Sequence, residues 1–265
     1  MSATRVIITG AASGIGAAAA AQLRERGANV VGLDINAGDG IVECDVRDQE
    51  SVESAVREAI ERLGGGVDVL INNAGVGFGQ SAGLVPDEKA LMVLDVNMIG
   101  PWRMTAAALP ALRASRGRVV NVASGLAHVT APFAPAYCMS KRALVAYSDA
   151  LRLEHGDAIT VTTVYPGYIK TPIHASSNED GFALDGIVPE EPLDHAAATL
   201  VRAALGRPAR DLATTRQGAV GYALARRAPR RLMDWLTLRT IRRHVARGGF
   251  ERSAMAREFV QRLRS

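Results

Sequence analysis

A glycine-rich turn between a β-branched run and an alanine-rich segment constrains the fold of this chain more than any other stretch. Residues 5–9 have the composition of a buried strand, and residues 14–27 favour a helix. Between them stands Thr9-Gly10-Ala11-Ala12-Ser13-Gly14-Ile15-Gly16. Glycines allow a tight turn and a close approach to a pyrophosphate, whose charge the free N–H groups and dipole of the following helix stabilise. This order of elements predicts a phosphate-binding strand, turn and helix.

The next predicted strand, at 29–33, ends in an acidic residue. Asp34 follows Gly10 by 24 positions, where a dinucleotide-binding unit places the carboxylate that accepts hydrogen bonds from the adenosine ribose. A 2′-phosphate there would face a like charge, at a cost of about 4 kcal/mol at contact distance and intermediate dielectric. Ile35 and Asn36 supply no arginine to offset it. The pattern favours NAD over NADP, with an aspartate that merely ends a strand as the alternative.

Apolar runs alternate with helical segments along most of the chain. This alternation is typical of βαβ units and predicts an α/β fold with a doubly wound, Rossmann-type parallel sheet. At 265 residues the chain is long enough for one such domain. We expect the cofactor-binding and catalytic domain at 1–216 and a helical extension at 217–265. The remaining predicted strands lie at 41–44, 67–71, 117–123 and 158–165, and the predicted helices at 49–63, 87–113 and 136–155.

Polar and glycine residues directly follow two of these strands. The strand at 67–71 leads into Asn72-Asn73-Ala74-Gly75, and the strand at 117–123 leads into Ser124. The carboxyl ends of parallel strands meet at one edge of the sheet, where open α/β folds bind ligands. We expect both groups to line one crevice. Asn97 is a polar residue inside an apolar helical region, and such a residue disagrees with the pattern around it. We therefore expect that it either caps a kink or serves a site.

Tyr137 and Lys141 stand four residues apart near the start of a long predicted helix. Residues at i and i+4 share a helix face, so the lysine ammonium is expected beside the phenol. A free tyrosine has a pKa near 10, and acid–base work near neutral pH requires about 4 kcal/mol of phenolate stabilisation, which an adjacent cation in a partly dry site can supply. The alternative is a solvated surface pair. A serine hydrolase is disfavoured, because Ser124 is not in a Gly-x-Ser-x-Gly turn and His128 follows it by only four positions.

Together these motifs resemble the short-chain dehydrogenase/reductase family in its compact single-domain form. The resemblance covers about residues 4–216, in the family's order and spacing. It implies a parallel sheet of about seven strands, nicotinamide cofactor binding, and a homodimer or homotetramer. The matching pieces are Thr9 to Gly16 (TGxxxGIG), Asp34, Asp45-Val46, Asn72 to Gly75 (NNAG), Asn97, Ser124, Tyr137 with Lys141 (YxxxK), and Pro166-Gly167 with Thr171.

The resemblance also implies roles for single residues. Tyr137 would exchange a proton with the substrate oxygen that Ser124 holds. Lys141 would stabilise the phenolate and bond the nicotinamide ribose, and Asn97 would anchor a proton-relay water. The implied cofactor-binding residues are Gly10, Ser13, Gly14, Ile15, Gly16, Asp34, Asp45, Val46, Asn73, Ala74, Gly75, Tyr137, Lys141, Ile169 and Thr171.

Charge is distributed unevenly along the chain. Residues 206–265 carry fifteen arginines and no lysine against four acidic residues, a net charge of +11, and since the whole chain carries +4 the rest carries −7. Met255, Phe259 and Leu263 predict a short amphipathic helix, whereas the apolar face drifts across 232–245 and predicts a broken pair of helices. We expect the extension to cover the substrate site or a subunit contact, with peripheral contact to a membrane surface as the second candidate.

The substrate is weakly encoded. A mobile lid is expected at 174–193, where apolar and acidic residues mix, and residues 129–136 add apolar side chains near Tyr137. An apolar pocket with an acidic rim suits a neutral, lipophilic secondary alcohol or ketone. NAD-dependent oxidation or reduction of this group is the leading function. A non-catalytic NAD-binding sensor or scaffold, an NAD-retaining epimerase or lyase, and a nucleic-acid binder remain alternatives.

Composition sets further bounds. Hydrophobic residues make up 48% and charged residues 22%, as is ordinary for a globular protein. No apolar stretch approaches the length of a membrane span, and the N-terminus lacks a signal-peptide pattern, so we expect a cytoplasmic protein. The two cysteines have no metal-ligand spacing, and we expect no metal site. Arginines without a recognition motif predict no specific nucleic-acid partner.

Overall fold

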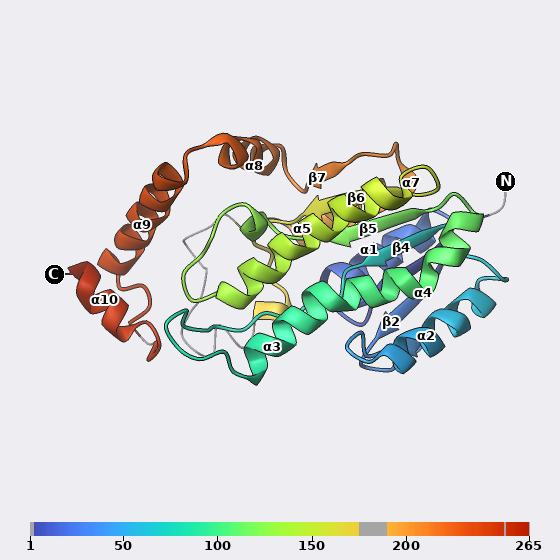
Figure 1. Ribbon diagram of the computed structural model, residues 1–265, viewed down its shortest axis with the longest axis horizontal. Coiled ribbons are helices and arrows are strands. Elements are labelled where there is room, and N and C mark those ends of the chain that lie inside the picture. Colours follow the sequence, from blue (N-terminus) through green and yellow to red (C-terminus); the bar gives the residue numbers. More distant parts are fainter. Residues whose placement is uncertain (1–2, 175–189, 252, 265) are drawn as a thin grey trace.

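Seven strands form one sheet in the order β3-β2-β1-β4-β5-β6-β7 in the computed structural model, which describes residues 3–174, 190–251 and 253–264 (Figure 1). Every neighbouring pair is parallel, which confirms the predicted doubly wound α/β fold. The chain order reverses between β1 and β4, so a crevice opens there at the carboxyl ends of the strands. The strands are β1 (Arg5–Thr9), β2 (Asn29–Asp34), β3 (Ile41–Glu43), β4 (Val69–Asn72), β5 (Arg118–Val122), β6 (Thr160–Tyr165) and β7 (Asp211–Ala213).

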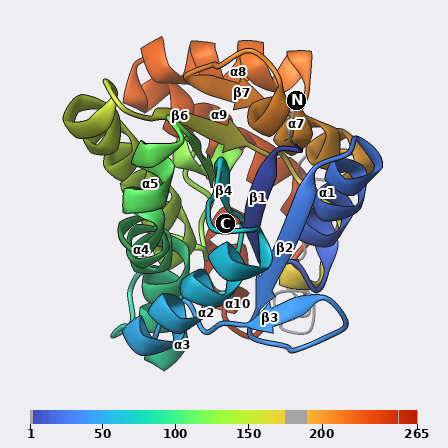
Figure 2. The same cartoon turned by 90° about the vertical axis from the view of Figure 1, so that its right-hand side faces the viewer.

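Two helical layers cover the sheet, as Figure 2 shows. Successive residues of a strand point to opposite faces. Val6 and Ile8 therefore pack with α1 (Gly14–Glu25) and α7 (Leu193–Leu205), whereas Ile7 packs with the opposite layer. All three side chains are fully buried. That second layer contains α2 (Gln49–Arg62), α4 (Gly100–Ala114) and α5 (Pro135–His155).

The helical region predicted at 87–113 is divided by a π-helical turn. It consists of α3 (Glu88–Leu94), the π turn Asp95–Ile99 and α4. Asn97 lies in the π turn and is fully buried. Single π turns inside α-helices are frequent at functional sites. The helix is thus irregular at Asn97, and the contacts of its side chain, described with the site, decide between the two predicted roles.

The extension consists of α8 (Arg216–Arg227), α9 (Arg230–Ala246) and α10 (Arg257–Arg264). α9 and α10 lie at the end of the molecule opposite the N-terminus, and α8 connects them to the body (Figure 1). The short helix predicted from Met255, Phe259 and Leu263 is confirmed only in part, because α10 begins at Arg257 and Met255 lies in the turn before it. Phe259 and Leu263 pack against a cluster that includes Phe250. The boundary expected at 216/217 falls at the start of α8.

The broken helix pair expected at 232–245 is wrong, because α9 is continuous over 17 residues. Its two apolar faces have different surroundings. Ile241 and Val245 are buried against residues around α10, while an N-terminal set stays on the outer face. One helix can therefore carry both faces without a break. The exposed set is Leu232, Trp235, Leu236 and Leu238.

Two other expectations concern the lid over the site and the absence of a membrane span. The lid expected at 174–193 falls mostly on 175–189, which lie outside the described residues. Within the described ranges, each helix is too short or too polar to cross a bilayer.

Candidate active site

A cleft of about 750 Å³ lies at the carboxyl ends of β1, β4, β5 and β6. Its lining brings together nearly all the residues that the sequence predicts for the site. Two of them, Gly16 and Asn97, do not line it. The predicted residues in the lining are Gly10, Ser13, Gly14, Ile15, Asp34, Asp45, Val46, Asn73, Ala74, Gly75, Ser124, Tyr137, Lys141, Ile169 and Thr171.

The glycine turn leaves no room for larger residues. Gly10 has φ +68°, and a Cβ there would stand 2.9 Å from Ala74 Cα. A Cβ on Gly16 would lie 2.6 Å from Asn73 Nδ2 and still closer to the carbonyl oxygen of Gly10. Thr9 Oγ1 accepts hydrogen bonds from the backbone N–H groups of Asn73 and Ala74, both at 3.0 Å, so the ends of β1 and β4 form one unit.

This unit fits an anionic group at the start of α1. The side chain of Ser13, at the N-cap, makes no capping hydrogen bond to the helix. The first N–H groups of an α-helix have no partner inside the helix, and the helix dipole favours negative charge there. A helix N-terminus beside a tight glycine turn is the geometry that holds a dinucleotide pyrophosphate.

Asp34 is fixed at the rim of the cleft by backbone donors. Its Oδ2 accepts from Ala12 N and its Oδ1 from Asn36 N, both at 3.0 Å. The side chain of Ile35 is 53% exposed beside it. The carboxylate is therefore oriented by the turn and is available to a ligand that enters the cleft.

Arg47, which the sequence analysis missed, binds Asp45, the second carboxylate among the predicted cofactor-binding residues. Arg47 Nη2 lies 2.6 Å from Asp45 Oδ2, and Nε lies 2.9 Å from Oδ1. These hydrogen bonds hold the pKa of Asp45 below its usual range. Arg47 also lines the cleft. The position of Arg47, two residues after Asp45, was the feature of the sequence that could have indicated this ion pair.

Tyr137 and Lys141 lie on successive turns of α5, as their spacing predicts. Lys141 Nζ is 5.6 Å from the centroid of the Tyr137 ring and donates to Val122 O at 2.9 Å. Ser124 Oγ accepts from Leu126 N at 3.2 Å, and the Ser124 hydroxyl also forms a hydrogen bond with the Tyr137 side chain. The hydroxyl and the phenol predicted to meet at one substrate oxygen are therefore neighbours.

The expected lowering of the phenol pKa does not appear in this geometry. Burial raises the pKa of Tyr137 to about 12, and the hydrogen bond with Ser124 opposes this only in part. Burial also lowers the pKa of Lys141 to about 8. The ammonium directs a proton to Val122 O, so desolvation of the phenol outweighs the neighbouring charge. At neutral pH Tyr137 is protonated and has a proton to donate.

Asn97 supports the site from behind. Its Oδ1 accepts from Val76 N and its Nδ2 donates to Val76 O, both at 2.9 Å. Nδ2 also lies 3.2 Å from Ser140 Oγ, on α5. Asn97 thus connects the loop after β4 to the helix that carries Tyr137. The relay water assigned to it by resemblance stays a prediction.

One end of the cleft is apolar, but its lining does not come from residues 129–136, where the sequence analysis expected it. Phe78, Met92 and Ile173 line this end, together with Tyr137. Phe78 packs in the same cluster as Tyr137. Its place three residues after the Asn-Asn-Ala-Gly segment was a usable signal, whereas Met92 comes from α3 and Ile173 from the short 3-10 helix Pro172–His174.

Residues 4–181 match the sequence profile of the family described as short chain dehydrogenase. The chain belongs to this family. Its members are oxidoreductases that act on CH–OH groups with a nicotinamide cofactor. The relative "Oxidoreductase UcpA" from Escherichia coli is 35% identical over 188 residues, which cover 64% of this chain and 71% of UcpA.

Two solved structures with the same fold contain different cofactors. A short chain dehydrogenase from Burkholderia cenocepacia, in complex with NADP, superposes with a TM-score of 0.75 at 28% identity, covering 88% of this chain and 96% of its own. A 3-ketoacyl-(acyl-carrier-protein) reductase from Brucella melitensis, complexed with NADH, has a TM-score of 0.70 at 28% identity, covering 80% and 98%. In the described part of this chain, no group of three or more His, Cys, Asp or Glu residues is placed to hold a metal ion.

Proposed function

We propose that this protein is an NAD-dependent oxidoreductase that transfers a hydride between the nicotinamide and a neutral, lipophilic secondary alcohol or ketone. The observation that carries the proposal is the meeting of Ser124, Tyr137 and Lys141 in the cleft that the glycine turn closes at its other end. The nicotinamide supplies the hydride chemistry when bound, and the protein supplies position and electrostatics.

The proton chemistry follows from the protonation states of two side chains. In the direction of ketone reduction, Tyr137 donates its phenolic proton to the substrate oxygen, which Ser124 orients by a hydrogen bond. The Lys141 ammonium, charged below pH about 8, offsets the phenolate that remains. In alcohol oxidation Tyr137 accepts the proton. This direction requires the phenolate and is therefore favoured at high pH.

The preference for NAD rests on the rim of the cleft. The Asp34 carboxylate would accept hydrogen bonds from ribose hydroxyls and would repel a 2′-phosphate. The nearby cation Arg47 is engaged by Asp45 in a bidentate pair, and Ile35 carries no charge. Because the structural relatives include both NADH and NADP complexes, both cofactors belong in the test.

The substrate class rests on the apolar end of the cleft. Phe78, Met92 and Ile173 offer carbon surface next to the phenol. Such a lining favours apolar groups on both sides of a carbonyl over hydroxyl-rich or phosphorylated compounds. A polyol would have to leave hydroxyl groups without partners against these side chains.

The proposal is tested by measuring turnover of the purified protein, with NAD or with NADP, on long-chain secondary alcohols, steroids and polyols. The absorbance of the reduced cofactor reports the turnover. Tyr137→Phe should abolish turnover. Tyr147→Phe on the same helix is a matched control, because its ring stacks on Trp102 outside the cleft. A strong preference for polyols would contradict the substrate class, and equal activity of Tyr137→Phe would contradict the mechanism.

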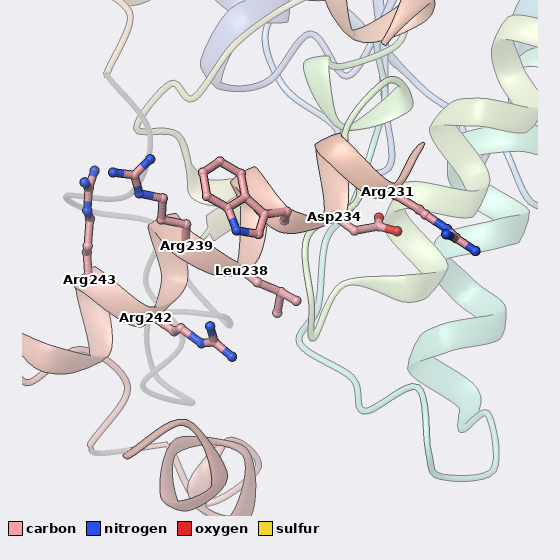
Figure 3. A pocket seen from close by; sticks show the side chains of 7 residues that line it. Arg231, Asp234, Leu238, Arg239, Arg242 and Arg243 are labelled. Carbon is pink, nitrogen blue, oxygen red and sulfur yellow. The ribbon is translucent and has the colours of Figure 1, made fainter. Parts of the chain in front are cut away.

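A non-catalytic NAD-binding scaffold is the second candidate, and the outer face of α9 is the observation that favours it. Trp235 is 52% exposed there, next to Leu238 and several arginines. Figure 3 shows these arginines spread along the helix with Asp234 as the acidic residue of the group. Tight NAD binding without turnover of any alcohol or ketone would support this function.

The contacts of the protein complete the proposal. We expect a homodimer or homotetramer in the cytoplasm, with the α9 face meeting either another subunit or an anionic membrane surface through its arginines and Trp235. Two measurements distinguish these partners. One is flotation of the protein with anionic and with neutral vesicles, and the other is the oligomeric mass of Trp235→Ala. Binding to anionic vesicles that Trp235→Ala abolishes indicates the membrane, and a smaller oligomer indicates the subunit contact.

A further inference from the structure

The first helix of the extension packs directly on the loop that carries Ser124. That loop is the 3-10 turn Gly125–Ala127, and Ser124 is its N-cap. The ring of Tyr222, on α8, lies against Gly125, because a Cβ added at Gly125 would stand 2.7 Å from Tyr222 Cζ and closer to its hydroxyl. Tyr222 also packs with Ala123 and Ala127, which lie on either side of Gly125 in the sequence. Residue 125 is therefore restricted to glycine by a side chain from the extension.

A second contact comes from the next turn of α8. Arg226 Nη2 donates to His128 Nε2 at 3.2 Å, and Nη1 donates to Asp211 Oδ2 at 3.2 Å. Arginine has no acceptor, so His128 must accept through Nε2 and is neutral in this contact. The His128 ring lies 4.7 Å from Tyr165 and 5.5 Å from Tyr222, centroid to centroid. Tyr222 and Arg226 are four residues apart and share the inner face of the helix.

The N-terminal end of α8 is fixed on the cofactor side of the cleft. Thr215 caps the helix by accepting from Gly218 N at 3.0 Å, and it donates to Glu191 Oε1 at 3.0 Å. Glu191 Oε2 accepts from Gly167 N at 3.1 Å, in the loop after β6 that borders the cleft. The helix is thus held at one end by the cleft wall and presses with its inner face on the Ser124 loop.

We propose that Tyr222 and Arg226 are positioning residues that hold the Ser124 hydroxyl in place for the substrate oxygen. The inference rests on the proposed function, since it takes Ser124 as the group that orients this oxygen. Ser124 begins the turn, so its backbone geometry depends on where Gly125 and His128 are held. A catalytic group displaced by about 1 Å can cost about 100-fold in rate. The extension therefore acts on the chemical step rather than on cofactor binding.

This role predicts a separation of kinetic constants. Tyr222→Ala should lower kcat at least tenfold and leave the Kd for NAD within twofold, because the glycine turn and Asp34 lie on other loops. Tyr222→Phe keeps the ring on Gly125 and should retain most of kcat. Leu224→Ala is the matched control, since that side chain is on the same helix and 64% exposed. For the second contact, Arg226→Ala should lower kcat and the exposed neighbour Arg227→Ala should not.

A double-mutant cycle tests the contact itself. Gly125→Ala drives a methyl group into the Tyr222 ring and should lower kcat on its own. Combined with Tyr222→Ala it should add little, because the ring that it strikes is gone. Fully additive effects of the two substitutions would overturn the proposal, as would a kcat of Tyr222→Ala within twofold of the unsubstituted protein.

A measurement that does not depend on enzyme activity separates this proposal from the proposed function. Amide hydrogen exchange of residues 125–129 should accelerate in Tyr222→Ala and stay unchanged in Leu224→Ala. If the unsubstituted protein turns over no alcohol or ketone, the proposed function fails, yet faster exchange still supports the packing of α8 on this loop. Unchanged exchange in Tyr222→Ala would overturn it independently of any substrate.

Discussion

Replacing Gly16 with alanine would directly disturb the turn that we predict to bind the cofactor pyrophosphate. The added Cβ would stand 2.6 Å from Asn73 Nδ2 and closer to the carbonyl oxygen of Gly10. Contacts of carbon with oxygen or nitrogen ordinarily begin at about 3.3 Å. The turn and the start of α1 must therefore separate by about 1 Å, which moves the N–H groups that face a bound pyrophosphate.

The size of the effect follows from the hydrogen bonds at stake. A hydrogen bond to a charged group contributes about 1.5–3 kcal/mol, and a shift of this size disables one or two of them. The loss expected from one such bond is about 1.5–3 kcal/mol, which weakens NAD binding roughly 10- to 160-fold, and the loss from two is about 3–6 kcal/mol. NADP binding should weaken by the same factor, because the pyrophosphate is common to both cofactors.

Isothermal titration of NAD and NADP into Gly16→Ala measures this loss. Gly83→Ala is a suitable control, because a Cβ there would meet its nearest neighbour at 3.8 Å, an ordinary contact, away from the cleft. Circular dichroism of both variants shows whether the fold survives. A folded Gly16→Ala protein that binds NAD within twofold of the unsubstituted protein would refute the assignment of the pyrophosphate to this turn.

Two further predictions concern pH. With saturating NADH, the rate of ketone reduction should be level from pH 6 to 7 and fall above pH about 8, as the buried Lys141 loses its proton; a profile flat to pH 10 would contradict this role. Burial, the charge of Arg226 and that of Arg142 lower the pKa of His128 to about 4, against the opposing influence of Asp211. The unfolded chain protonates this histidine at about pH 6.5, so its contribution to stability is complete above that pH and is lost as the pH falls to about 4. The free energy of unfolding in urea should fall less steeply over this window in His128→Gln, and equal slopes would count against a buried, neutral His128 beside Arg226.

Local patterns made much of this protein predictable. The alternating apolar runs predict the parallel sheet, because the central strands β1, β4, β5 and β6 are buried on both faces. The spacing of Tyr137 and Lys141 predicts their meeting, because it depends on one turn of one helix. The glycine turn and Asp34 are predictable for the same reason, since a single strand, turn and helix place them.

The remaining features depend on contacts between distant parts of the chain. The π turn at Asn97 is stabilised by hydrogen bonds to Val76 and Ser140, which helix periodicity cannot indicate. The burial of Ile241 and Val245 on α9 depends on residues around α10, which are distant from the start of α9 in the sequence. The raised pKa of Tyr137 follows from the depth of its burial and not from the charge of its neighbour. Tyr222 shows no motif at all, and its importance is visible through the space it fills beside Gly125.

Transfer of deuterium from the reduced cofactor to a ketone is the most direct test of the proposed chemistry. The protein is incubated with NADH that carries deuterium at the transferable position and with a long-chain ketone, and the product is examined by mass spectrometry. We expect a secondary alcohol with one deuterium on the carbinol carbon, formed by the unsubstituted protein and by Tyr147→Phe but not by Tyr137→Phe. Deuterated alcohol formed equally by Tyr137→Phe, or no deuterated alcohol from any ketone although NADH binds tightly, would contradict the proposal.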